Sequence, residues 1–135
     1  MRGVLVDTGP LVAIVDRDDA FHESCVRAAN TFRDPVYTVW PVIAEAMYLV
    51  GFLHGRERLW DLIDHAPVRL RALEAADLSS IRALMKKYAD LPMDLADAAL
   101  VHVAARDGLH TVFTIDRADF QIYRLPGGRR LRLLP

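Results

Sequence analysis

The sequence predicts an α/β fold in which a mostly parallel sheet of four to five strands is flanked by helices. Short apolar runs alternate along the chain with longer segments of helical periodicity, an order typical of parallel strands joined by helical crossovers. Gly, Pro and Asp stand where several apolar runs end, as turn formers do. The chain of 135 residues with a hydrophobic content of 53% has enough apolar material for one core. We therefore expect a single domain over residues 1–135.

The first half of the chain is expected to contain two strands and three helices. The apolar run before Asp7 ends at Thr8, Gly9 and Pro10, which predicts a buried strand that leads into a loop. Thr38 is expected to cap a helix that has Pro41 in its first turn. The expected elements are a strand at 4–6, a helix at 21–32, a strand at 36–38, and helices at 38–53 and 56–64.

The second half is expected to contain three strands and two helices. Apolar and charged residues alternate at 68–71, which predicts a strand with one exposed face. Asp77 and Asp94 are each expected to cap a helix, and Gly108 is expected to end the second of these helices. The expected elements are strands at 68–73, 111–114 and 131–134, and helices at 77–88 and 95–107.

Composition restricts the location and the partners of the protein. The most apolar stretch, residues 40–53, contains Glu45 and is shorter than the ~20 residues of a membrane span. An acid at position 7 leaves no room for a signal peptide, and the single Cys25 cannot form an intrachain disulfide. We therefore expect a cytoplasmic protein without a membrane segment.

The net charge of −1 does not by itself attract nucleic acid. Four arginines nevertheless lie close together near the C-terminus, at positions 124, 129, 130 and 132. Such a cluster suits phosphate contact, although a solvated tail or a partner-binding edge explains it equally well.

Glu45 is the only charged residue between Thr38 and Leu53. A helix this apolar is expected to be mostly buried, and Glu is almost never fully buried unless it is paired or binds a metal. Glu45 is therefore a candidate metal ligand. A buried salt bridge to an arginine is the alternative.

Asp97 is expected in the first turn of its helix, on the same face as the apolar Leu100, Val101 and Ala104. The helix dipole favours an acid in this turn, and Asp94 and Asp97 together resemble a capping box. We interpret Asp94 as a cap and Asp97, which points inward, as a candidate functional residue.

Asp7 and Asp116 each follow an expected strand. Either one alone is explained as a turn residue, but the carboxyl ends of parallel strands and the N-termini of the returning helices share one edge of the sheet. This edge should therefore gather Asp7, Glu45, Asp97 and Asp116. Crowded carboxylates repel one another unless a cation compensates them, and Mg²⁺ or Mn²⁺ is the usual cation for oxygen ligands.

In their order and spacing these segments resemble PIN domains, and most closely the VapC toxins of toxin–antitoxin pairs. The resemblance is carried by Val-Leu-Val-Asp-Thr at 4–8, Ala44-Glu45, Asp97-Ala98 in a helix that ends at Gly108, and Val-Phe-Thr-Ile-Asp at 112–116 followed by Asp119-Phe120. The resemblance implies a Mg²⁺- or Mn²⁺-dependent endoribonuclease that is inhibited by a cognate antitoxin.

The resemblance also implies roles for individual residues. Asp7, Glu45, Asp97 and Asp116 would be the catalytic metal ligands, and Thr8 and Thr114 would order the site. Asp94 and Asp119 lie near matched positions and are alternative ligands. The apolar segment at 42–53 and the neighbouring Leu59-Trp60 predict a homodimer as well, because they offer more apolar surface than a monomer of this size buries.

Three other functions are compatible with parts of the sequence. An RNA-processing PIN nuclease without a toxin role has the same site. A non-catalytic binding module of the same fold would hold its acids in salt bridges. Asp7-Thr8-Gly9 also matches the signature of aspartic proteases, but those enzymes are all-β, whereas residues 40–53 and 95–107 are expected to be helical.

Overall fold

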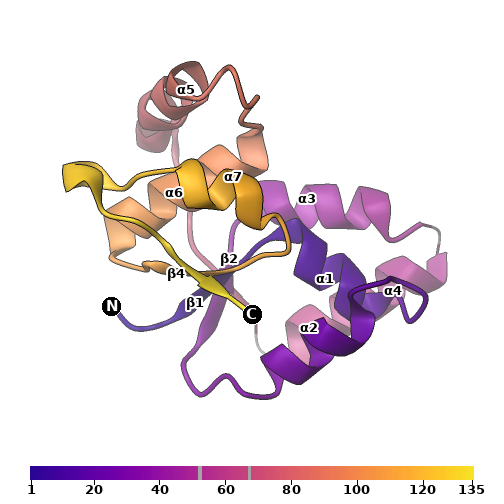
Figure 1. The fold of residues 1–135 in the computed structure, drawn as a ribbon. Helices are drawn as coiled ribbons and strands as arrows, with labels where there is room; N and C mark the ends of the chain where they lie inside the picture. The colour runs from indigo at the N-terminus through magenta and orange to yellow at the C-terminus, as the bar shows by residue number, and fades with distance from the viewer. Residues whose placement is uncertain (52, 67) are drawn as a thin grey trace.

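The computed structural model describes residues 1–51, 53–66 and 68–135 and contains one five-stranded sheet (Figure 1). The strands are ordered β3-β2-β1-β4-β5, and all four neighbouring pairs are parallel. The predicted mostly parallel α/β sheet is confirmed. The strands are β1 (Val4–Val6), β2 (Val36–Thr38), β3 (Val68–Leu70), β4 (Thr111–Phe113) and β5 (Arg132–Leu134).

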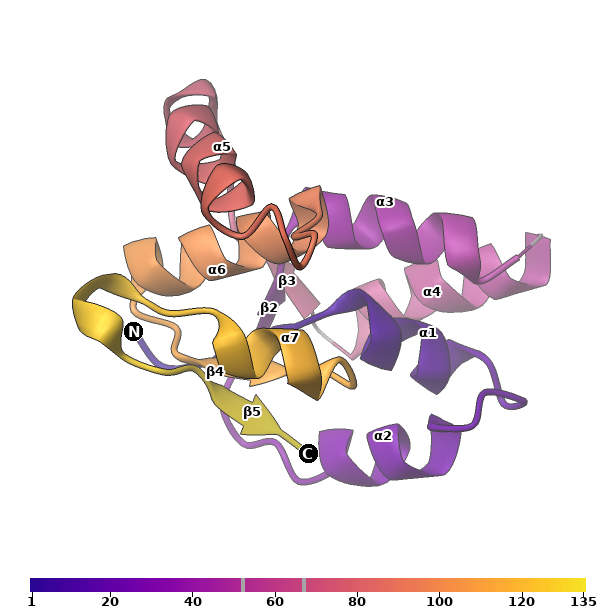
Figure 2. The same ribbon diagram turned by 45° about the horizontal axis from the view of Figure 1, so that its top comes forward.

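Helices cover both faces of the sheet (Figures 1 and 2). On one face α1 packs against α2 and α4; on the other face lie α6 and α7, with α5 packed on the outside of α6. Helix α3 contacts both α1 and α6. The helices are α1 (Thr8–Val15), α2 (His22–Ala29), α3 (Trp40–Leu49), α4 (Leu53–His65), α5 (Leu78–Lys87), α6 (Leu95–Asp107) and α7 (Arg117–Ile122), with 3-10 turns η1 (Ala75–Asp77) and η2 (Pro126–Gly128).

The core lies where β1 and β4 meet the central helices. All three residues of β1 are buried, as are Val112 and Phe113 of β4. Eight of the thirteen residues of α6 are buried, so this helix is the central element of its layer. Burial on both faces explains why residues 4–6 and 112–113 are consecutive apolar residues and do not alternate with polar ones.

The loop predicted after Asp7 is wrong, because residues 8–15 form helix α1. Asp7 is the N-cap of this helix, and its side chain accepts a hydrogen bond from the backbone N–H of Thr8. Pro10 is compatible with the helix because the first turn needs no intrahelical N–H donor at that position. The residues that resemble a turn in the sequence are therefore a helix start.

One further predicted cap, Thr38, is wrong, and another, Asp77, is the N-cap residue of its helix but makes no side-chain cap bond there. The Thr38 hydroxyl donates to the Val6 carbonyl at 2.9 Å and so links β2 to β1, and α3 begins after Val39 instead. Asp77 forms a reciprocal capping pair with Glu74 at η1 and does not cap α5 with its side chain. The side chains of Thr38 and Asp77 therefore form hydrogen bonds with other groups and not with the helix ends to which they were assigned.

Helix α3 is shorter than predicted and α7 was not predicted. Helix α3 ends at Leu49, and Gly51 turns the chain with a φ of 80°, a left-handed conformation that favours glycine. Phe52, which the predicted helix at 38–53 included, lies outside the described residues. The predicted cap by Asp94 is confirmed, since it accepts from the Asp97 N–H at 2.8 Å, and Gly108 ends α6 with a φ of 67°.

The strand order reverses between β1 and β4, and this reversal fixes the position of a ligand site. From β1 the chain proceeds outward to β2 and β3, and it then returns to place β4 on the other side of β1. Open parallel sheets bind ligands at the carboxyl ends of the strands where such a reversal occurs. Asp7 follows β1 directly, and Asp116 follows β4 by three residues.

Candidate metal centre

Asp7, Asp97 and Asp116, three of the four acids predicted from the sequence, lie near one another at the carboxyl edge of the sheet. The first turns of α1, α3, α6 and α7 lie at this edge (Figures 1 and 2). Among the described residues, one group of acids approaches metal-binding distance: each of Asp97, Asp116 and Asp119 offers a carboxylate oxygen, and these oxygens lie within 4.8 Å of one another. Ligand atoms around a Mg²⁺ ion lie about 3 to 4 Å apart, so small side-chain adjustments would complete such a site.

Asp7 is held rigidly at the end of β1. Its side chain is 6% exposed and accepts hydrogen bonds from the Thr8 N–H at 2.8 Å and from the Thr114 hydroxyl at 2.9 Å. Burial raises the pKa of Asp7 to about 6, and the charges of Glu45 and Asp94 add to this rise. The two donors orient the carboxylate but leave its charge only partly compensated.

Asp97 is the most perturbed acid of the cluster. It is 8% exposed, and burial raises its pKa to about 8, with further contributions from the charges of Asp7, Asp94 and Asp116. The hydroxyl of Tyr123 donates to its Oδ2 at 2.8 Å. A nearby cation would remove the electrostatic penalty of ionising this carboxylate.

Asp116 and Asp119 are brought together by α7. Asp116 precedes the helix and Asp119 lies in its first turn, so three residues separate them on one face. Loss of hydration and the charge of Asp119 raise the pKa of Asp116. Asp119 was expected only as an alternative ligand, because α7, which brings it close to Asp97 and Asp116, was not predicted.

Glu45 lies in a less buried position than expected. Helix α3 buries only Val42, Ile43 and Ala46, and Glu45 itself is half-buried. The prediction of a mostly buried helix is therefore wrong. Glu45 is near enough to raise the pKa of Asp7 by its charge, although it does not belong to the group of oxygens within 4.8 Å. Among the described residues it forms no ion pair with an arginine.

Thr8 provides an independent sign that the site has a further ligand. Its side chain is 3% exposed, and its hydroxyl is the only buried side-chain polar atom of the described residues without a hydrogen-bond partner. Buried hydroxyls are nearly always bonded to protein or to ordered water. A hydroxyl beside Asp7 is well placed to bond a water molecule of a hydrated cation. The residues present therefore fit a hard divalent ion.

Tyr123 is a site residue that sequence reasoning missed. It is fully buried, it contacts the rings of Phe120 and Tyr88 at centroid distances of 5.1 and 5.0 Å, and its hydroxyl holds Asp97. Nothing in the sequence marks it, because a tyrosine 26 residues from its partner resembles any core aromatic. The hydrogen bond between Tyr123 and Asp97 depends on α7, because Tyr123 is the residue at the end of that helix.

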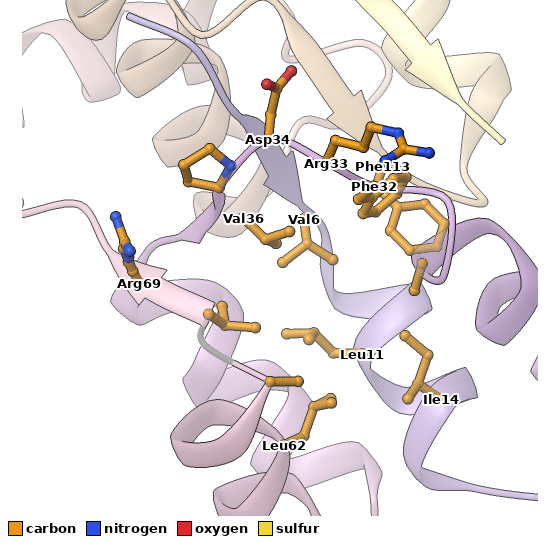
Figure 3. A pocket seen from close by; sticks show the side chains of 14 residues that line it. Val6, Leu11, Ile14, Phe32, Arg33, Asp34, Val36, Leu62, Arg69 and Phe113 are labelled. Atoms are coloured by element: carbon orange, nitrogen blue, oxygen red, sulfur yellow. The ribbon is translucent and has the colours of Figure 1, made fainter.

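An apolar cavity of about 410 Å³ lies on the other side of the sheet from α6 (Figure 3). Its walls come from α1, α4, the end of α2 and the sheet, and include Leu11, Ile14, Phe32 and Leu62. The one acid in its lining, Asp34, forms an ion pair with Arg2. The cavity lacks the acids of the cluster, so it does not contribute to metal binding.

Comparison with known proteins identifies the class. A family model described as PIN domain matches residues 4–125. The chain therefore belongs to the PIN-domain family, as the resemblance predicted. No helix within the described residues is long and apolar enough to cross a membrane. The parallel sheet and its helices exclude the all-β aspartic protease alternative.

Individual relatives point to one branch of this family. Ribonuclease VapC26 of Mycobacterium tuberculosis is 29% identical over 136 residues, which cover 98% of this chain and all of that protein. The crystal structure of Mycobacterium tuberculosis VapC20, described as a sarcin-ricin loop cleaving toxin, matches with a TM-score of 0.75 at 18% identity over 84% of this chain and 90% of its own. VapBC2 from Rickettsia felis, bound to a promoter DNA fragment, matches with a TM-score of 0.62 at 16% identity over 98% of both chains.

The raised pKa values predict that the metal-free protein loses stability as the pH rises. The folded-state pKa values of Asp7 and Asp97, about 6 and about 8, exceed the ordinary value of 3.8. The folded protein therefore retains protons that the unfolded chain has released, and the free energy of unfolding should fall between about pH 4 and pH 8. Asp77 and Asp107, whose hydrogen bonds lower their pKa to about 2, act in the opposite sense below about pH 4.

Urea unfolding in EDTA as a function of pH measures this effect. Asp97→Asn should flatten the decline between about pH 4 and pH 8, because it removes the largest shift. Asp94→Ala serves as the control: it removes the cap and should lower the free energy of unfolding by about 0.5–2 kcal/mol, but it should flatten the decline much less, because the Asp94 charge is a smaller cause of the raised pKa values than burial is. A wild-type protein that is more stable at pH 8 than at pH 5 in EDTA would contradict the geometry described for Asp7 and Asp97.

The Tyr123 hydroxyl is predicted to position Asp97 for metal binding. Tyr123→Phe keeps the ring and removes only the donor, so the fold should survive while Mn²⁺ affinity falls by about tenfold, as is usual when a partner of a metal ligand is lost. Tyr88→Phe is the matched control, because its hydroxyl accepts from the Arg124 N–H and touches no acid of the cluster. Equal Mn²⁺ affinities of the two variants in calorimetric titrations would show that the hydroxyl does not act through Asp97.

Proposed function

We propose that the protein is a metal-dependent endoribonuclease, with residues 1–135 acting as one PIN-like nuclease domain. The observation that supports this proposal most strongly is the convergence of Asp97, Asp116 and Asp119 beside the buried Asp7 at the strand-order reversal. Mg²⁺ or Mn²⁺ is the proposed ion, because the ligands are all carboxylate oxygens. The curated relative is a ribonuclease.

The proposed ligands are Asp7, Asp97 and Asp116, with Glu45 completing the set and with Asp94 and Asp119 as further candidates. A bound divalent ion supplies an activated water and stabilises charge on the leaving oxygen of the phosphodiester. The protein orients its side chains for this chemistry. The Thr114 hydroxyl and the Thr8 N–H orient the Asp7 carboxylate by hydrogen bonds. The Tyr123 hydroxyl donates to Oδ2 of Asp97, which would leave Oδ1 for the ion.

We propose further that this nuclease is the toxin of a VapBC-type pair and acts on cytoplasmic RNA. The relatives that match are VapC proteins, and one of them was solved as a VapBC assembly. An RNA-processing nuclease without a toxin role remains the alternative. Expression in a bacterial host separates the two: a toxin arrests growth unless its antitoxin is present, and an RNA-processing enzyme does not.

Inhibition by an antitoxin follows from the charge of the site. An Arg or Lys of the partner would compete with the metal for the acids through charge-assisted hydrogen bonds. The cavity between α1, α2 and α4, with its largely apolar lining (Figure 3), is suited to an apolar side chain of the same partner. The antitoxin would then bind the acids through a basic side chain and the cavity through an apolar side chain, on different faces of the molecule.

The metal requirement tests the nuclease proposal directly. EDTA should abolish RNA cleavage, and Mg²⁺ or Mn²⁺ should restore it. Asp7→Asn and Asp97→Asn each remove a ligand charge with little change of shape, so cleavage should fall by orders of magnitude while circular dichroism shows an intact fold. Full activity in EDTA, or near-normal turnover in both variants, would exclude the proposed mechanism. A protein that neither binds metal nor cleaves RNA would be a binding module.

A homodimer is predicted to form through the exposed side of α3. Trp40 and Tyr48 are 55% and 79% exposed and lie with Ala44 on one stripe, because four residues separate each pair. Trp40→Ser with Tyr48→Ser should shift the mass in size-exclusion chromatography with light scattering from dimer to monomer. Phe21→Ser, which changes an exposed aromatic residue before α2, is the control. A wild-type protein that is monomeric at micromolar concentration would refute the prediction.

A further inference from the structure

Positive charge is concentrated in two segments of the chain. Helix α5 and residues 120–135 together contain seven Lys and Arg and no Asp or Glu, although the net charge of the whole chain is −1. The remaining residues therefore carry a net charge of −8. The seven cations are Arg82, Lys86, Lys87, Arg124, Arg129, Arg130 and Arg132. We call them the basic surface.

The structure brings the two segments together. The backbone N–H of Arg124 donates to the hydroxyl of Tyr88 at 2.9 Å, and Tyr88 is the residue that follows α5. A hollow of about 560 Å³ has Lys87 on one wall and Arg124 on another, with α6 between them. In Figures 1 and 2, α5 and the segment that leads from α7 to the edge strand β5 both lie near α6. The two segments that carry these seven charges are distant in the sequence but are neighbours in the fold.

Most of these cations are available to a ligand. All except Arg124, which is half-buried, are exposed, and within the described part of the chain none of the seven forms a salt bridge. Lys87 lies over the Tyr88 ring, and Arg124 donates through Nη1 to the carbonyls of residues 121–123 at the end of α7. Five exposed arginines and lysines outside these two contacts are available for substitution: Arg82, Lys86, Arg129, Arg130 and Arg132.

The basic surface approaches the acid cluster at Arg124. Arg124 follows Tyr123, whose hydroxyl bonds Asp97, and Tyr88 contacts the Tyr123 ring. A polyanion whose scissile phosphate lies at the cluster would therefore have neighbouring phosphates close to positive charge.

We infer that the basic surface binds the phosphate backbone of the RNA substrate beside the cleavage position. This inference rests on the proposed nuclease function. A site with as many as six carboxylates repels RNA, and one divalent ion offsets only two of these charges. The affinity for RNA must then come from cations outside the cluster, because phosphate neutralisation supplies most of the binding free energy in complexes that do not depend on sequence.

Charge-removing variants and the salt dependence of binding test this inference. Arg129→Gln with Arg130→Gln changes the C-terminal segment, and Arg82→Gln with Lys86→Gln changes α5. Arg27→Gln with Arg58→Gln is the control, because it removes the same charge from α2 and α4, which lie across the sheet. Fluorescence anisotropy with a labelled single-stranded RNA in EDTA reports binding without metal-dependent cleavage.

Each basic-surface variant should weaken RNA binding by about tenfold, and each lost phosphate contact should reduce the slope of log Kd against log salt by about 0.7. The control should change neither quantity by a comparable amount. With Mg²⁺ present, KM should rise while kcat at saturating RNA stays near the wild-type value, because these residues do not touch the metal ligands.

Several outcomes would overturn the inference. Equal weakening of RNA binding by the control variant would indicate a general charge effect. Unchanged RNA affinity and salt slope in the basic-surface variants would show that these residues do not contact RNA. Loss of antitoxin binding with unchanged RNA binding would make the surface a protein interface. The nuclease proposal fails separately. A wild-type protein that binds RNA with the predicted salt dependence but does not cleave it with Mg²⁺ supports the surface and refutes the catalytic role.

Discussion

The structure depends on one electrostatic constraint, namely that two buried carboxylates share the carboxyl edge of the sheet. Asp7 and Asp97 are almost fully buried, and the charge of Asp7 raises the pKa of Asp97. Hydrogen bonds from Thr8, Thr114 and Tyr123 orient these carboxylates without cancelling their charge. Such an arrangement is unfavourable in a metal-free protein at neutral pH. A bound divalent ion would make it favourable. The unfavourable burial of carboxylate charge without metal and the proposed metal chemistry therefore have the same origin.

The fold and part of the site were predictable because they follow from local patterns and from topology. Short apolar or alternating segments located all five strands, and the shared edge of strand ends and helix starts predicted that Asp7, Asp97 and Asp116 lie close together. The errors arise where one residue type serves two purposes. Gly9 and Pro10 are as acceptable in a first helical turn as in a loop, and the apolar composition of α3 predicts burial although much of that helix faces outward.

Other features depend on tertiary contacts that no sequence pattern encodes. Asp119 joins Asp97 only because α7 follows β4, and Tyr123 reaches Asp97 from the end of that helix. The basic surface was visible in the sequence as four arginines without an assigned role. Its extension to α5 became apparent from the contact between Arg124 and Tyr88. In the proposed arrangement, the acids would bind the metal and the neighbouring basic surface would bind RNA, so that a chain of net charge −1 could act on a polyanion.

If the acid cluster binds a divalent ion, anomalous diffraction from a crystal grown with Mn²⁺ should reveal it. We predict an anomalous peak bounded by Asp7, Asp97 and Asp116, within coordination distance of at least two of their carboxylates. Asp97→Asn should weaken or abolish this peak. No peak at this edge of the sheet in a crystal at neutral pH, or Mn²⁺ bound only elsewhere, would contradict the account.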